Sequence, residues 1–109
     1  MVQKIKWTLC ALNDLNNIYE FIAKDSRQYA QIQVENIQNS VSNLARFPLM
    51  GRNVPEFPHL PYQEILVGNY RVLHRFKEDQ GQVIVMSVVH GRRLLKEPSN
   101  FEYKKITKH

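Results

Sequence analysis

The stretch from residue 63 to residue 76, QEILVGNYRVLHRF, decides how this chain folds. Two runs rich in branched and aromatic residues, 63–67 and 70–76, flank the dipeptide Gly68-Asn69. Runs of this kind are typical of β-strands, and a glycine-asparagine pair permits the positive φ angles of a two-residue turn. The stretch therefore predicts a β-hairpin.

Two further runs extend this hairpin into a sheet. Residues 82–89, QVIVMSVV, are the most strand-prone run of the chain and follow a second turn, KEDQG, at 77–81. Residues 2–7 alternate weakly, with Ile5 and Trp7 on one face. We expect a three-stranded meander, with the N-terminal strand available to extend it.

Between the first strand and the hairpin, the apolar period changes to that of an α-helix. Apolar residues recur at steps of four, three and four across 11–22, directly after Thr8, whose hydroxyl can cap the first turn. Ser26 offers the next cap, and the same steps recur across 30–44 until Pro48 stops the helix. The pattern predicts two antiparallel helices joined by a short turn.

The predicted element order is β-α-α-β-β-β, an α+β fold. The helical hairpin packs on one face of a small, mostly antiparallel sheet, because each helix has an apolar stripe that must be covered. Residues 48–62 hold four of the five prolines, so no regular element is expected there. A loop of this length is either a stiff crossover or a functional segment. A single domain is expected over 1–95, followed by a basic tail or short helix at 96–109.

Composition narrows the function classes. The lone Cys10 cannot form an intrachain disulfide, and the four histidines have no metal-site spacing. No apolar run reaches the ~20 residues of a membrane span, and no signal-peptide core is present. We expect a cytoplasmic protein with no cofactor, no metal and no membrane partner. The net charge is +5, and residues 90–109 carry six Lys/Arg against two Glu, which favours an acidic protein or a nucleic acid as partner.

Basic and titratable residues of the meander form the candidate site. Alternation along 70–76 places two arginines on the sheet face opposite the helices, which we expect to be open. The last strand ends in a histidine, a glycine that lets the backbone turn, and two arginines, and the hairpin carries a glutamate. We expect these side chains to converge on one concave basic surface. They are Glu64, Arg71, His90, Arg92 and Arg93, with Arg75 on the same strand face as Arg71 as a secondary candidate.

These residue types match the needs of RNA cleavage without a metal. Histidine is a residue type that can act as acid or base near neutral pH, and His90 would take that role. Arginine forks match phosphate oxygens, and Glu64 would act as a base or pair with Arg71. The alternative is structural: Glu64 and Arg71 form an ion pair across the sheet, and His90 caps a strand end. His74 has apolar neighbours and is expected to be a core residue.

Four motifs occur in order along the chain. They are IKWT followed by A-x-x-D-L, L-x-x-F-P-x-x-G-R-x-V-P-E at 44–56, E-I-x-x-G-N-Y-R-V at 64–72, and V-V-H-G-R-R at 88–93. In this combination the chain resembles the toxins of bacterial type II toxin–antitoxin systems in the ParE/RelE superfamily, often labelled plasmid stabilisation proteins. The resemblance extends from Ile5 to about Leu95.

The resemblance implies a growth-inhibiting toxin held inactive by a cognate antitoxin. ParE-like members poison DNA gyrase, whereas RelE-like members cut messenger RNA in the ribosome without a metal. Matching motifs assign target-binding or catalytic roles to Arg71, His90 and Arg93, with Arg52 and Tyr103 as secondary candidates.

The chain departs from the nuclease pattern in two places. Many relatives have arginine where Gln63 precedes Glu64, and the lysine-rich segment that RelE-like nucleases keep before the hairpin is absent. These departures favour a ParE-like gyrase inhibitor. A RelE-like ribosome-dependent endoribonuclease remains the alternative, and a third possibility is an inactive toxin that only binds its antitoxin.

Overall fold

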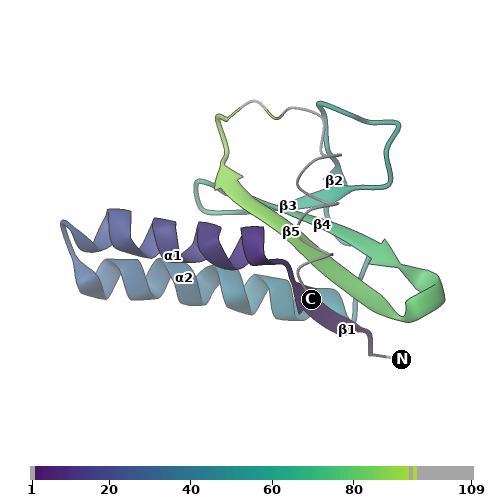
Figure 1. Ribbon diagram of the computed structural model, residues 1–109, viewed down its shortest axis with the longest axis horizontal. Helices are drawn as coiled ribbons and strands as arrows, with labels where there is room; N and C mark the ends of the chain where they lie inside the picture. Colours follow the sequence, from purple (N-terminus) through teal and green to yellow (C-terminus); the bar gives the residue numbers. More distant parts are fainter. Residues whose placement is uncertain (1, 94, 96–109) are drawn as a thin grey trace.

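A computed structural model describes residues 2–93 and 95 of the chain. The expectations for 96–109, including the role of Tyr103, lie outside these residues. The strands and helices predicted from the sequence are confirmed, and one short strand is additional (Figure 1). In chain order the elements are β1 (Lys4–Trp7), α1 (Leu9–Ala23), α2 (Arg27–Ser42), a 3₁₀ turn (Asn43–Ala45), β2 (Arg52–Asn53), β3 (Gln63–Val67), β4 (Tyr70–Lys77), a second 3₁₀ turn (Glu78–Gln80) and β5 (Gln82–His90).

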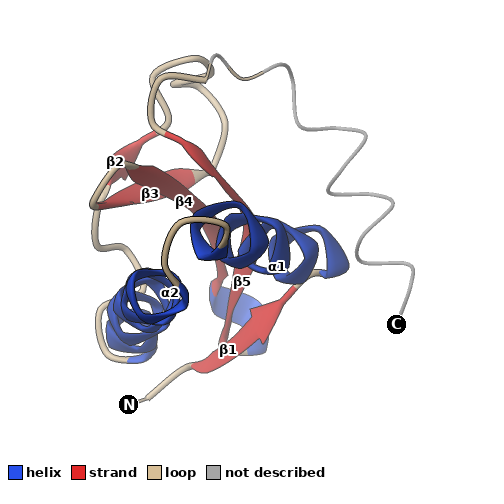
Figure 2. Ribbon diagram, turned by 90° about the vertical axis from the view of Figure 1, so that its left-hand side faces the viewer, coloured by secondary structure: helices blue, strands red, loops and turns tan. Residues whose placement is uncertain are grey.

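The five strands form one mixed sheet in the order β1-β5-β4-β3-β2. β1 runs parallel to β5, and the other neighbours are antiparallel. Both helices lie side by side against the sheet (Figures 1 and 2). Thr8 and Ser26 accept hydrogen bonds from first-turn amides, so both predicted caps are confirmed. Within the described residues, no helix is long and apolar enough to cross a membrane.

The additional strand corrects the expectation that no regular element exists within 48–62. Arg52 pairs with Glu64, and Asn53 pairs with Gln63. Gly51 makes this approach possible, because its φ is +103° and a side chain there would collide with the carbonyl oxygen of Glu64. The loop is therefore tied to the edge of the sheet by a two-residue strand.

The sheet face opposite the helices is covered, so the expectation of an open face is wrong. Val54, Phe57 and Tyr62 from the loop are buried against this face. Their partners on the sheet are the buried residues Leu73, Ile84, Met86 and Val89. The proline-rich segment thus forms one side of a second hydrophobic core. Its prolines reduce the conformational entropy that the segment loses when it folds against the sheet. We call residues 54–62 the covering loop.

β5 carries an irregularity that changes which face its last residues occupy. Leu73 pairs with Ser87 and His74 pairs with Val85, so Met86 is left without a partner on β4. Such a bulge reverses the alternation of side chains beyond it. Before the bulge, the even-numbered Ile84 and Met86 belong to the covering-loop core; after it, the odd-numbered Val89 does.

Where β1 ends, side chains of α1 and of its N-cap form the hydrogen bonds that a neighbouring strand would otherwise form with β5. The Thr8 hydroxyl donates to the carbonyl of Met86 at 3.0 Å, so the same side chain caps α1 and occupies the bulge. One carboxylate oxygen of Asp14 accepts hydrogen bonds from the Ser87 hydroxyl and the Val88 amide, both at 2.8 Å. Asp14 therefore replaces the strand that β5 lacks at this point.

Replacing Asp14 with alanine is expected to lower the free energy of unfolding by about 2–3 kcal/mol, because two charge-assisted hydrogen bonds disappear and an edge amide loses its partner. Urea unfolding should show a lower midpoint with an unchanged m-value. Glu20→Ala is the matched control, since it removes an exposed carboxylate from the same helix. Equal midpoints for the two variants would contradict the edge-capping role of Asp14.

Candidate functional site

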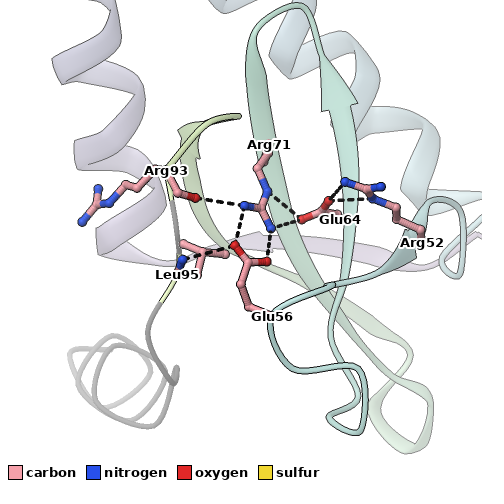
Figure 3. A network of polar contacts seen from close by, with 6 residues as sticks. All are labelled: Arg52, Glu56, Glu64, Arg71, Arg93 and Leu95. Atoms are coloured by element: carbon pink, nitrogen blue, oxygen red, sulfur yellow. Dashed lines mark hydrogen bonds and ion pairs between the residues drawn. The ribbon is translucent and has the colours of Figure 1, made fainter.

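A network of ion pairs lies between the sheet and the covering loop (Figure 3). Arg71 of β4 faces Leu66 of β3, and Glu64, two residues earlier, is its diagonal neighbour on the same face. The Arg71 Nη2–Glu64 Oε1 distance is 2.6 Å, and Arg71 Nε donates to the same oxygen at 2.8 Å. Glu56 of the covering loop receives a two-pronged contact from the two Nη atoms of Arg71, at 2.6 and 2.8 Å.

Every N–H group of the Arg71 guanidinium is engaged. The group has five donors: Nε–H and one Nη2–H point to Glu64, one N–H from each Nη points to Glu56, and the remaining Nη1–H donates to the carbonyl of Arg93 at 3.0 Å. The Arg71 side chain is only 6% exposed. It therefore has no free donor for a phosphate oxygen.

Both carboxylate oxygens of Glu64 are also bound by arginine side chains. Its side chain is fully buried, Arg71 binds one carboxylate oxygen, and Arg52 binds the other through Nε and Nη2 at 2.8 Å. Arg52, at 58% exposed, is the solvent-facing end of the network. Two arginines balance two glutamates, so the buried charges compensate one another, as burial requires.

The ion pair between Glu56 and Arg71 shifts the pKa values of both side chains. The hydrogen bonds from Arg71 lower the pKa of Glu56 from its usual 4.5 to about 2. Those same bonds raise the pKa of Arg71 further above its already high ordinary value. Both groups are therefore charged at neutral pH.

His90, Arg92 and Arg93 are exposed at the end of β5. The His90 ring packs edge-on against Tyr70, with ring centroids 5.8 Å apart. Its Nδ1 accepts a hydrogen bond from the Arg92 amide at 3.2 Å, which assigns the proton of the neutral ring to Nε2.

His90 and Arg93 border a surface groove of about 340 Å³ between α1 and the end of β5. Ile18 and Phe21 of α1 line one wall, and Phe21 is 70% exposed. His90 and Arg93 contribute the other wall. Asp14 and Asn17 also line the helix wall, so the groove combines apolar, acidic and basic side chains.

The structure separates residues that we expected to converge. His90 pairs with Tyr70, which packs against the helix-side core, whereas Arg71 points to the covering loop. The bulge at Met86 is the physical reason, because it turns the even-numbered residues of β5 from the covering-loop face to the helix face. Arg71 and Glu64 are internal partners, as the structural alternative expected, while His90 is an exposed strand-end residue. Their roles toward a target stay predictions.

The remaining candidates are distributed as follows. Arg75 is half-buried, with its guanidinium carbon 5.8 Å from the centroid of the Tyr62 ring. His74 is a core residue, as expected: it is fully buried, Nε2 lies 3.1 Å from the carbonyl of Met50, and burial lowers its pKa to about 4. Among the described residues, its Nδ1 has no hydrogen-bond partner. Across residues 2–93 and 95, no cluster of three metal-ligating side chains occurs.

Sequence reasoning missed Glu56 as part of the site. It is the single acidic residue between Pro48 and Tyr62. A buried arginine that faces one glutamate has donors to spare, and a lone carboxylate in the adjacent loop is the natural second partner. The sequence shows that Glu56 lies in this loop, but it does not show that the loop folds back onto Arg71.

Acid should weaken the fold through Glu56. Its carboxylate stabilises the folded protein fully above pH 4.5, and this contribution is lost as the pH falls from about 4.5 to about 2. Glu56→Gln removes the titrating group, so its free energy of unfolding should depend less steeply on pH over that interval. Chemical denaturation at a series of pH values measures both curves. Parallel curves for the two proteins would show that Glu56 has an ordinary pKa.

Comparison with known proteins agrees with this architecture. The profile of the family described as "ParE toxin of type II toxin-antitoxin system, parDE" matches residues 5–95. No curated protein sequence matches the chain.

Solved structures with the same fold come from both branches of the superfamily. A chain of the chromosomal ParDE toxin–antitoxin system from P. aeruginosa aligns with a TM-score of 0.69 and 18% identity, over 82% of this chain and 96% of that one. A chain of the RelBE2 toxin–antitoxin complex from Mycobacterium tuberculosis aligns with a TM-score of 0.62 and 20% identity, over 83% and 99%. A mutant E. coli RelE toxin in the free state aligns with a TM-score of 0.61 and 14% identity, over 99% and 98%.

At these identities the structural matches show a shared fold, and the family profile covers most of the chain. On that basis, the chain belongs to the ParE toxin family and is a toxin of a type II toxin–antitoxin system.

Proposed function

We propose that this toxin acts in the ParE manner: it inhibits DNA gyrase by binding it, without chemistry of its own. The observation that carries the proposal is the engagement of Glu64 and Arg71. A nuclease site on this sheet face needs a base and a phosphate ligand, and both candidates are bound to protein partners here. This arrangement favours a binding protein over an enzyme.

The groove between α1 and the end of β5 has the features of a protein-binding surface. It joins an exposed aromatic residue, Phe21, to the basic residues His90 and Arg93. Aromatic and arginine side chains are enriched at protein interfaces, where they contribute much of the binding free energy. We assign the contact with the target to this groove and to the neighbouring Arg92.

A cognate antitoxin completes the proposal. The relatives from P. aeruginosa and M. tuberculosis are members of toxin–antitoxin systems. The net charge of +5 favours a neutralising segment that is net acidic. With gyrase as target, the toxin would act in the cytoplasm, without a membrane partner, metal or cofactor.

One observation favours the second candidate, a ribosome-dependent endoribonuclease. His90 is exposed at the end of β5, and Arg92 and Arg93 follow it after Gly91. An imidazole beside two guanidinium groups can transfer a proton and stabilise phosphate charge. In the third candidate, a toxin that only binds its antitoxin, the same residues have no cellular target.

Purified toxin is expected to produce gyrase-dependent DNA cleavage in a supercoiling reaction. The double variant Arg92→Ala/Arg93→Ala should raise the toxin concentration required by about tenfold or more, because two cations leave the interface. Arg27→Ala, which removes an exposed cation from α2, is the matched control and should behave like the wild type. Unaltered supercoiling at saturating toxin rejects the proposal.

Two further assays separate the alternatives. Primer extension on translating ribosomes would show new messenger ends if the toxin were a nuclease, and His90→Ala would suppress them. If cells that express the protein without antitoxin grow normally, both toxin activities are excluded, and the protein is a module that only binds its antitoxin.

A further inference from the structure

The chain that follows β5 is attached to the rest of the molecule by a series of hydrogen bonds. The Gly91 amide donates to the carbonyl of Asn69 at 2.7 Å. The carbonyl of Arg93 accepts from Arg71 at 3.0 Å, and the Leu95 amide donates to Glu56 Oε2 at 3.2 Å. Beyond the turn at Gly91, therefore, this segment is attached to the Glu56–Arg71 ion pair.

The two halves of the ion pair act on neighbouring backbone groups. Arg71 supplies a donor to the carbonyl of Arg93, and Glu56 supplies an acceptor to the amide of Leu95. The same Glu56 oxygen receives Arg71 Nη1, so a single pair of side chains holds both ends of the segment. The Leu95 side chain packs beside the covering-loop core, which strengthens the attachment.

The Arg93 side chain leaves this attached backbone on the side away from the ion-pair network (Figure 3). Figure 3 shows the Arg93 carbonyl directed at Arg71 and the Arg93 guanidinium on the opposite side, away from the network. Arg93 lines the groove beside α1. The hydrogen bond from Arg71 thus holds the backbone from which the Arg93 side chain extends to the groove.

We propose that the Glu56–Arg71 ion pair is a latch that fixes the path of the chain after β5 and so positions Arg92 and Arg93 for the target. Glu56 and Arg71 are positioning residues that act through the backbone of residues 93 and 95, without contacting the target. The inference rests on the proposed function for the consequence at Arg92 and Arg93. The latch itself rests on the contacts of the free protein.

The latch requires the planar guanidinium. Arg71 reaches Glu64, Glu56 and the Arg93 carbonyl at once because its donors diverge in one plane. A lysine ammonium has the charge but only three donors around one nitrogen. Arg71→Lys should therefore leave the segment detached, although the net charge is unchanged.

Residue-resolved hydrogen exchange of the full chain tests the latch directly. In Glu56→Gln, the Leu95 amide should exchange at least about tenfold faster, because a charge-assisted hydrogen bond is lost. Amides of β5 before the bulge should keep their protection, which shows that the fold persists. Glu78→Gln removes an exposed carboxylate at the β4–β5 turn and is the matched control. Unchanged Leu95 exchange in both Glu56→Gln and Arg71→Lys would overturn the latch.

The gyrase cleavage assay tests the positioning role in the same variants. Glu56→Gln should raise the toxin concentration required by several-fold, and Glu78→Gln should not. Faster Leu95 exchange combined with wild-type activity would overturn the positioning of Arg92 and Arg93. If the wild-type toxin has no effect on gyrase, the proposed function fails, and the exchange measurement alone decides whether the latch exists.

Discussion

The charge of Arg71, buried between the sheet and the covering loop, is the constraint on which the rest of this face depends. A guanidinium with 6% of its side chain exposed is stable only when carboxylates and carbonyls replace its water shell. Glu64, Glu56 and the carbonyl of Arg93 do so, and each comes from a different part of the chain. Loss of any one would leave an uncompensated buried donor or charge.

The partners that compensate the buried charge of Arg71 also determine the structure of the surface around it. Glu64 is drawn into the interior and in turn binds Arg52 beside the short strand β2, while Glu56 ties the covering loop to β4. The groups that look catalytic in the sequence are thereby used to build the protein. The groups that remain accessible are His90 at the end of β5 and Arg92 and Arg93 after it. His90 and Arg93 line a groove together with an exposed aromatic residue of α1. That division of roles is the physical basis for proposing a toxin that binds its target rather than one that cleaves it.

Much of the fold could be predicted from local patterns, and the errors have local causes too. Helical steps, caps and the Gly68-Asn69 turn indicated both helices and the meander correctly, because these features depend on nearby residues. The bulge at Met86 could not be foreseen, since an alternating strand gives no sign of which residue will lack a partner. It moved His90 to the helix face and separated it from Arg71. The covering loop was also missed, because nothing local in a proline-rich segment shows that Val54, Phe57 and Tyr62 complete a second core.

Nuclear magnetic resonance of the Arg71 guanidinium is the most direct measurement of this account. A guanidinium with every N–H bonded cannot rotate freely, so its Nη protons should give separate, slowly exchanging signals that inorganic phosphate does not shift. Arg27, which is exposed on α2, provides the internal reference of a freely rotating side chain. Averaged Nη signals for Arg71 that respond to phosphate as those of Arg27 do would contradict the account, because they would show an arginine open to a target.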